Sequence, residues 1–468
     1  MAKQVQAQTN DVLADHDAVG LAEAIRRRDI SPREAAEAAM DRIQAVDGEL
    51  NAVEQARFEE AVSNLGDLGR GGFAGVPTMI KDNMDVRGWP TRHGAEAFTP
   101  PVADNNDPFV DQFLDQGFTV LGKTRLPEFG FNGSTEFQNQ EPVRNPWHTD
   151  YTAGGSSGGA AALVASGALP IAHGNDGGGS IRIPAAASGL VGLKSTRGRL
   201  VKSLASRSLP VNLISEGVLS RTVRDTARFL AQAEQYHQPR RLPPVGLVEG
   251  PGSKRLKVGV VLDSITGTPT DTETRETVEA TARALQHHGH GVEEIAPPVP
   301  ERFIEDFKTY YGFMAFMVSR FGHRMMAPDF DPEKLDGLTR GLAAYYAERK
   351  RKTPAVMTIL QLSRFYYARA MRDFDVIISP VLGHTVPELG WLNPNVPFET
   401  LFERLIQYAS FTPANNASGG PAISLPMGMS RAGTPIGVQA AAAHGDERTL
   451  LEVAFALEQD PGWQSIRS

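Results

Sequence analysis

The sequence has 468 residues, 41% of them hydrophobic, which is enough to bury a large core. Its formal net charge of -8 argues against a polyanion as partner, so we expect no nucleic-acid partner. The absence of cysteine excludes disulfides, thiolate metal sites and a cysteine nucleophile.

The first residues carry no sign of export or membrane insertion. The segment 1–20 is polar and acidic, and it lacks the apolar stretch that a signal peptide needs. No run in the chain approaches the roughly 18 apolar residues required to cross a bilayer. We therefore expect a cytoplasmic protein without a membrane partner.

Helices and short apolar strands alternate in the first half of the chain. Ser31-Pro32-Arg33-Glu34 is a capping box with proline at the first helical position, so it predicts a helix start. Val76–Ile80 predicts a buried strand that ends at Lys81. Asp107-Pro108 predicts a helix that Gly117 ends. The further elements predicted here are a strand over 118–121, a small-residue helix over 158–166 and a strand around 169–172.

The second half repeats this alternation. The elements predicted in it are a strand over 258–262, a helix from about 274 to 288, and strands near 292–295, 376–378 and 422–425. The Pro- and Gly-rich segment 238–254 predicts a surface connection, and 301–372 is helical and rich in Phe, Tyr and Met. Strands separated by helices indicate a largely parallel, helix-covered sheet. No composition break divides the chain, so we expect a single domain over 1–468.

The segment 154–184 concentrates glycine and serine, GGSSGGAAALVASGALPIAHGNDGGGSIRIP. Apolar residues between its two Gly/Ser clusters indicate ordered structure, in which glycine marks a positive φ or a close approach of the backbone to a ligand. Gly177-Gly178-Gly179-Ser180 therefore predicts a turn whose backbone N–H groups converge on one point. Such a point is suited to the oxyanion of a tetrahedral intermediate.

A serine nucleophile needs a base, and two residues are candidates. His173 precedes Ser180 by seven positions and is more simply interpreted as a core histidine. Lys81 stands at the end of an apolar strand, where burial lowers the pKa of an amine by disfavouring its charged form. The alternative for Lys81 is a lysine at the surface or in a salt bridge beside Asp82.

Five ordered motifs make this sequence resemble the amidase signature family. Ser156 follows Lys81 by 75 positions and Ser180 follows Ser156 by 24, which is the spacing of that family's Ser–Ser–Lys triad. The similarity runs from about Gly20 to Trp463. The motifs are FAGVPTMIKDN at 73–83, GKT at 122–124, RNPW at 144–147, GGSSGG at 154–159 and GNDGGGSIRIP at 174–184.

The resemblance implies a fold, an activity and a set of roles. The fold is a single α/β/α sandwich around a large mixed, mostly parallel sheet, with a signature core over about 71–200 and a substrate-side helical segment over about 301–372. Ser180 is the implied nucleophile, Ser156 the bridging serine after a cis peptide bond, and Lys81 the base. The backbone N–H groups of Gly177, Gly178 and Gly179, continuing to Ser180, are the implied oxyanion hole.

The same resemblance implies supporting roles for three further residues. Asp176 and Arg182 are expected to hold the nucleophile turn, and Ser157 to support Ser156. The sequence departs from the common pattern at Asn175, where serine is frequent, and also at Ala153 and Gly177. We expect none of these departures to touch a triad side chain.

The implied reaction is hydrolysis of a linear or cyclic carboxamide, with no cofactor and no metal. The spelling HGND at 173–176 is similar to that of 6-aminohexanoate cyclic-dimer hydrolases. The partner is then a small-molecule amide, and a homodimer is common in the family. Residues 129–134 approach the substrate by family analogy. An aromatic and Met set could line an acyl pocket but is more often core: Phe303, Phe307, Tyr310, Tyr311, Phe313, Met314 and Phe316.

Other hypotheses stay open. The A subunit of tRNA-dependent glutamyl amidotransferase shares the triad but acts in a complex. An α/β-hydrolase elbow, G-x-S-x-G, would make Ser156 or Ser157 the nucleophile with His384 or His444 as base, but it must follow a strand, and 144–153 predicts a loop. A phosphate-binding glycine turn lacks a Walker lysine. The histidines at 287–290 are interpreted as an exposed helix end rather than as a metal site.

Overall fold

The computed structural model describes residues 3–65 and 71–466. The N-terminal part runs α1 (Ala18–Arg27), α2 (Pro32–Leu50), β1 (Val53–Ala56), α3 (Phe58–Ser63), β2 (Pro77–Lys81), α4 (Pro108–Leu114), β3 (Thr119–Thr124), η2 (Glu128–Gly130), β4 (Arg144–Asn145) and β5 (His148–Thr152). The central part runs α5 (Gly158–Ala165), β6 (Ile171–Asp176), α6 (Arg182–Ser188), β7 (Val191–Lys194), α7 (Leu204–Ser208), β8 (Ser215–Ser220) and α8 (Val223–Tyr236).

The C-terminal part contributes the remaining strands and a group of long helices. These elements are β9 (Lys257–Val260), α9 (Thr272–His287), β10 (Gly291–Glu294), α10 (Phe303–Met325), η3 (Pro332–Lys334), α11 (Gly337–Arg349), η4 (Lys350–Lys352), α12 (Thr353–Ala370), β11 (Val376–Pro380), α13 (Phe398–Tyr408), α14 (Pro413–Ser418), β12 (Ala422–Met429), β13 (Pro435–Ala442) and α15 (Glu447–Leu457).

Local sequence signals set several boundaries as predicted. Ser31 caps α2, since its hydroxyl accepts from the Glu34 N–H while the Glu34 carboxylate accepts from the Ser31 N–H. Asp107 caps α4 ahead of its first-turn proline. The strand predicted to end at Lys81 is β2, and the predicted connection over 238–254 has neither helix nor strand.

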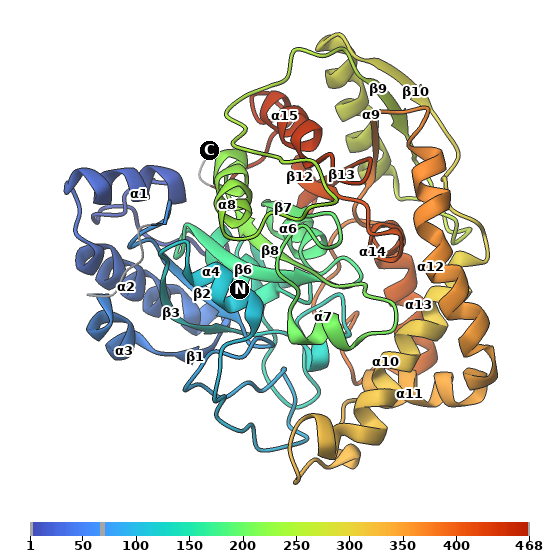
Figure 1. Cartoon of the computed structure of the whole chain (residues 1–468), viewed down its shortest axis with the longest axis horizontal. Coiled ribbons are helices and arrows are strands. Elements are labelled where there is room, and N and C mark those ends of the chain that lie inside the picture. The colour runs from blue at the N-terminus through green and yellow to red at the C-terminus, as the bar shows by residue number, and fades with distance from the viewer. Residues whose placement is uncertain (1–2, 66–70, 467–468) are drawn as a thin grey trace.

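Eight strands form the large sheet, in the order β10-β9-β11-β13-β12-β7-β8-β6. Helices cover both faces, because the alternation along β13 directs Gly437 and Gln439 to α6 and Val438 and Ala440 to the side of α15. Helices α8, α9 and α15 lie on that second side (Figure 1). The expected α/β/α sandwich around a large mixed sheet is confirmed.

The expectation that this sheet is mostly parallel is wrong. Within the described residues, β9 pairs in parallel with β10 and β11, whereas the other five pairings are antiparallel. Each antiparallel pairing involves β7, β8 or β13, three strands that the apolar runs did not predict. The parallel direction that the helix–strand alternation indicated holds, within this sheet, for β9, β10 and β11.

A smaller sheet continues the large one at β6. Its order is β1-β3-β2, with β2 and β3 parallel. The Thr78 hydroxyl donates to the Ile171 carbonyl at 2.9 Å, and the Lys81 N–H donates to His173 Nδ1 at 3.2 Å, so side chains join β2 to β6. This junction brings residues from two separate parts of the chain together.

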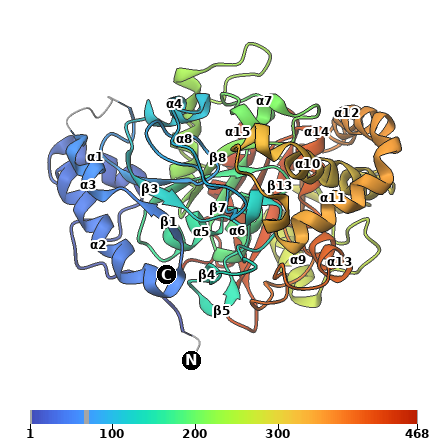
Figure 2. The ribbon, with the colours of Figure 1, turned by 90° about the horizontal axis from the view of Figure 1, so that it is seen from below.

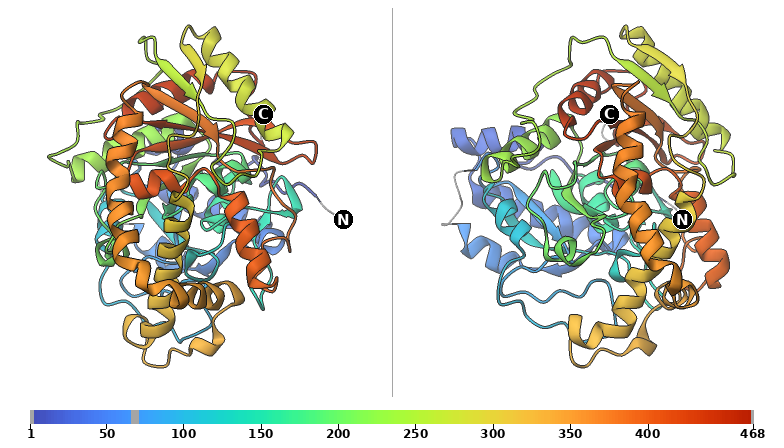
Figure 3. Two further views of the ribbon diagram at one scale, coloured as in Figure 1. Left: turned by 90° about the vertical axis from the view of Figure 1, so that its right-hand side faces the viewer. Right: turned by 45° about the vertical axis from the view of Figure 1, so that its right-hand side comes forward.

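Helices α10, α11 and α12 form a group on one side of the molecule, beside α13 and α14 (Figures 2 and 3). These three helices lie within the segment 301–372, for which the sequence predicts helix. No helix in residues 3–65 and 71–466 is both long and apolar enough to cross a bilayer.

Candidate active site

Lys81 is the last residue of β2, and its side chain is fully buried. Its Nζ lies 2.7 Å from Ser156 Oγ and 2.7 Å from Asn175 Oδ1. The neighbouring Asp82 pairs with Lys123 at 3.2 Å instead. The alternative of a surface or salt-bridged lysine therefore does not apply.

Burial determines the protonation of this amine. Loss of water around the charged form lowers the pKa of Lys81 from 10.5 to about 7, although the charges of Glu216 and Asp176 act in the opposite direction. Roughly half of the molecules then carry a neutral amine at pH 7. A neutral amine has a lone pair and is able to accept a proton.

Ser156 lies in the turn between β5 and α5. The Gly155–Ser156 peptide bond is cis. A Cβ at Gly155 would come within 2.7 Å of the Asn132 carbonyl oxygen, so this position requires glycine. The Ser157 hydroxyl donates to the Asn175 carbonyl at 3.4 Å, which ties the turn to β6.

Ser180 lies in the turn that joins β6 to α6. It lines a pocket together with Gly155 and Gly178. Among the described residues its hydroxyl has no hydrogen-bond partner, so the structure does not show the contact from Ser180 to Ser156 that a relay needs. Hydrogen bonds of this kind often tighten when substrate binds.

The amides of the glycine turn differ from one another. Within the described part of the chain, the N–H groups of Gly177, Gly178 and Ser180 donate to no other group. The N–H of Gly179 donates to Asp176 Oδ1 at 2.8 Å, which corrects the expectation that it faces an oxyanion. Gly179 is required for another reason: its φ is 133°, and a Cβ there would lie 2.3 Å from Thr412 Oγ1.

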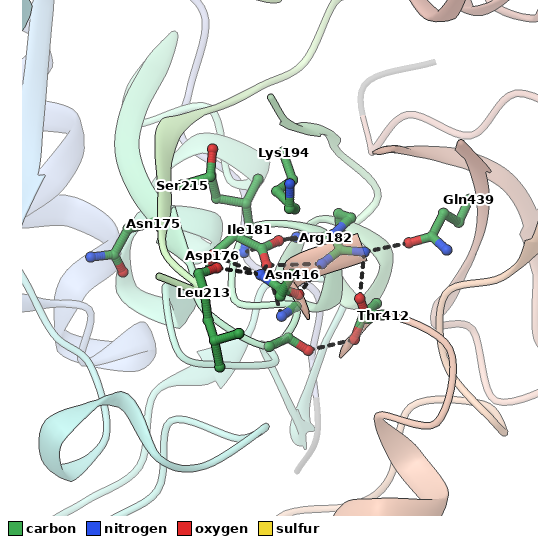
Figure 4. A network of polar contacts seen from close by, with 12 residues as sticks. Asn175, Asp176, Ile181, Arg182, Lys194, Leu213, Ser215, Thr412, Asn416 and Gln439 are labelled. Atoms are coloured by element: carbon green, nitrogen blue, oxygen red, sulfur yellow. Dashed lines mark hydrogen bonds and ion pairs between the residues drawn. The ribbon is translucent and has the colours of Figure 1, made fainter. Parts of the chain in front are cut away.

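Asp176 and Arg182 form the buried centre of the network that holds this turn (Figure 4). Arg182 Nε and Nη2 each donate to the carboxylate at 2.9 Å, and the Asn416 amide donates to it at 2.8 Å. Arg182 Nη1 reaches the Thr412 carbonyl and Gln439 Oε1. The nucleophile turn is thereby bonded to β13 and to α14 with its N-cap.

Charge pairing keeps Asp176 ionised. Burial acts to raise the pKa of this carboxyl, but the Arg182 guanidinium and the Asn416 amide outweigh it and bring the pKa to about 2. The predicted supporting positions of Asp176, Arg182 and Ser157 are thus all in contact with the two turns.

His173 lies below this site, on β6. Its Nδ1 accepts the Lys81 N–H, so Nε2 carries the proton of the neutral ring and faces Glu216 at 3.4 Å. Burial lowers the pKa of His173. The core interpretation of this histidine agrees with these contacts.

Asn175 was missed as a site residue, and the expectation that it touches no triad side chain is wrong. It stands two positions after His173 on a strand, so both side chains project from the same face. The face of β6 that meets Lys81 at His173 also presents Asn175. The two-residue alternation of side chains along a strand, counted from His173, is the signal that could have identified Asn175.

The pocket beside Ser180 is open and mostly apolar, with a volume of about 710 Å³ including the space at its mouth. Phe303, Phe307 and Tyr311 line it, spaced four apart along one face of α10. Tyr310 is instead buried against Val211, and its hydroxyl donates to the Val211 carbonyl. Helix α13 adds Phe402 and Leu405 to the wall, and Asn132 and Gly133 come from the expected segment 129–134.

The histidines of the α/β-hydrolase hypothesis bond elsewhere. His384 Nδ1 contacts the Thr385 carbonyl at 2.7 Å, and His444 Nε2 contacts the Ser418 carbonyl at 3.0 Å. The segment 144–153, predicted as a loop, contains the β4–β5 hairpin, which is a separate two-stranded sheet. Its strands are not part of the large sheet on which such an elbow depends.

Comparison with known proteins points in one direction. The family model described as Amidase matches residues 34–451. The chain is 43% identical to the Mycobacterium tuberculosis protein named "Putative amidase AmiC", over 99% of this chain and 98% of that protein. It is 34% identical to the 6-aminohexanoate-cyclic-dimer hydrolase of Paenarthrobacter ureafaciens, over 96% of each.

Solved structures agree with these sequence matches. The structure of a 6-aminohexanoate cyclic dimer hydrolase complexed with substrate superposes with a TM-score of 0.86 at 32% identity, covering 95% of this chain and 96% of that chain. A bacterial aryl acylamidase of the amidase signature family gives a TM-score of 0.83 at 26% identity, covering 96% of each.

Proposed function

Because this chain belongs to the amidase family, and is a hydrolase of carbon–nitrogen bonds other than peptide bonds, we propose that it cleaves a carboxamide through an acyl-enzyme on Ser180. Lys81 is the base, and Ser156 carries the proton between them. The observation that carries the proposal is the 2.7 Å contact between the buried Lys81 Nζ and Ser156 Oγ, beside a pocket lined by Ser180.

Acylation moves one proton along this path. The neutral Lys81 amine takes the Ser156 proton while Ser156 takes the Ser180 proton, and Ser180 Oγ attacks the carbonyl carbon. The amides of Gly177, Gly178 and Ser180 are available to the oxyanion. When the carbon–nitrogen bond breaks, the Lys81 ammonium returns a proton through Ser156 to the leaving amine.

Deacylation repeats the sequence with water. The relay removes a proton from water as its oxygen attacks the acyl carbon, and the proton returns to Ser180 as the ester bond breaks. The products are a carboxylic acid and ammonia or an amine. Metal participation is not required for any of these transfers.

The pocket wall supports an apolar group next to the scissile bond. Phe303, Phe307, Tyr311, Phe402 and Leu405 supply aromatic and aliphatic surface, so this wall fits linear or cyclic amides with short alkyl or aryl groups. A substrate panel should therefore vary chain length, ring closure and an aryl substituent.

Serine variants test the proposal. Ser180→Ala is expected to lower kcat by about 10⁴- to 10⁶-fold, as loss of a nucleophile does elsewhere. Ser208→Ala, at an exposed serine on α7, is the matched control and should keep the wild-type rate. A fluorophosphonate probe should label Ser180, as mapped by peptide mass spectrometry. Wild-type turnover by Ser180→Ala, or a label on Ser157, would refute the assignment.

A further inference from the structure

Asn175 is placed to act on the base. The residue is 7% exposed, and its Oδ1 lies 2.7 Å from Lys81 Nζ. Figure 4 shows this side chain pointing away from the Asp176–Arg182 network, as the alternation of β6 requires. Among the residues that the structure describes, the amide oxygen and Ser156 Oγ are the two side-chain groups hydrogen-bonded to the amine.

The donor and acceptor groups of a neutral amine determine which atom donates in this contact. A neutral primary amine has two N–H donors and one lone pair, whereas an amide oxygen is only an acceptor. The Asn175 oxygen therefore binds an N–H of Lys81 and leaves the lone pair free. The lone pair is then available at the second contact, with the Ser156 hydroxyl.

We infer that Asn175 is a positioning residue, whose carbonyl oxygen orients the Lys81 amine so that its lone pair faces Ser156. The inference rests on the proposed function, because it assigns Asn175 a part in the same proton path. Serine is frequent at this position in the family pattern, so the amide oxygen of Asn175 is one of the departures of this sequence from that pattern.

An uncharged acceptor suits this position. Glu216 on β8 and Asp176 on β6 already stabilise the Lys81 ammonium, and Asp176 is itself paired with Arg182. His173 presents a neutral ring on the same face, while on the side of β3 Lys123 is paired with Asp82. A further carboxylate in direct contact would favour the ammonium and leave less neutral base at neutral pH.

Two substitutions with opposite effects test the inference. The rate of Ser180 labelling by a fluorophosphonate would be measured from pH 5 to 10 for wild type, Asn175→Asp and Asn175→Leu. Asn175→Asp should move the midpoint of the acidic limb of this pH–rate profile to higher pH by about 1–3 pH units, since a carboxylate replaces a neutral acceptor. Asn175→Leu should move it downward, because the ammonium loses a hydrogen bond, and should lower the plateau by roughly 10- to 100-fold through loss of orientation.

Thr78→Val is the structural control. It removes a buried hydrogen bond between β2 and β6 without touching the amine, so stability should fall while the midpoint of the limb stays in place. If Asn175→Leu does not fold, the upward shift in Asn175→Asp remains the test.

The outcomes separate the two proposals. Labelling of wild type at Ser180 with unmoved midpoints in both Asn175 variants would overturn the role of Asn175 alone. Absence of any label on wild-type Ser180 would overturn the proposed function and this inference with it.

Discussion

Replacing Glu216 with glutamine should make the enzyme more active in acid. The Glu216 carboxylate is the foremost charge that stabilises the Lys81 ammonium against the effect of burial. With a pKa of about 7 for Lys81, roughly 1% of the amine is neutral at pH 5 and roughly 99% at pH 9. Wild-type kcat/KM should therefore rise about 100-fold over that interval, with a midpoint near pH 7.

The substitution lowers the Lys81 pKa, because the neutral amide no longer offsets the charge of the ammonium. Each decrease of one unit in the Lys81 pKa gives roughly tenfold more neutral amine at pH 5 and almost no change at pH 9. Glutamine keeps an oxygen that is able to accept from His173 Nε2, so the packing beneath Lys81 is retained. The predicted signature is a gain in activity confined to acidic pH.

The assay is kcat/KM from pH 5 to 9 with an uncharged p-nitroanilide, whose own ionisation does not change. Glu294→Gln, at an exposed position on β10, is the matched control and should follow the wild-type curve. A wild-type rate that is flat over this range, or a Glu216→Gln curve identical to wild type, would refute the assignment of the limb to Lys81.

The nucleophile turn gives two further predictions. Gly179→Ala should destabilise the protein and abolish labelling of Ser180, since the added Cβ would lie 2.3 Å from Thr412 Oγ1. Gly178→Ala should fold normally, because the nearest atom to its added Cβ is 3.6 Å away. Equal midpoints of urea unfolding for the two variants would contradict this prediction. Arg182→Met leaves the Asp176 carboxylate buried without its cation and should reduce the free energy of unfolding by about 3–5 kcal/mol. A change below about 1 kcal/mol in urea unfolding would show that the pair does not hold the turn.

Local signals in the sequence predicted those parts of the fold that depend on nearby residues. The capping box at Ser31 fixes the start of α2, because both of its hydrogen bonds lie within four residues. The apolar run before Lys81 identifies β2 for the same reason. Pairing direction depends on strands that meet across the fold, and nothing nearby in the chain records it.

Strands β8 and β13 show why the sheet was misread. Ser215–Ser220 has serine at both ends and a buried glutamate, so no apolar run marks it. Pro435–Ala442 begins with proline and contains three alanines, which favour helix over strand. Both form strands because their neighbours supply hydrogen bonds along their length.

The candidate site divides in a similar way. The motif spacing predicted Lys81, Ser156 and Ser180 as site residues, and the structure places the first two in contact. It did not identify Asn175, since only the approach of β2 to β6 turns that side chain toward the amine. The motif spacing also did not indicate that the Gly179 N–H would donate to Asp176, because that hydrogen bond depends on how the carboxylate is oriented within the turn.

The helix α10 contributes to the pocket through residues four apart, while Lys81, Ser156 and Ser180 lie on strands and turns at the sheet side. Substitutions along that face of α10 would change the shape of the pocket and leave these three residues unaltered. A library confined to Phe303, Phe307 and Tyr311 is therefore a direct way to vary the part of the pocket wall that α10 supplies.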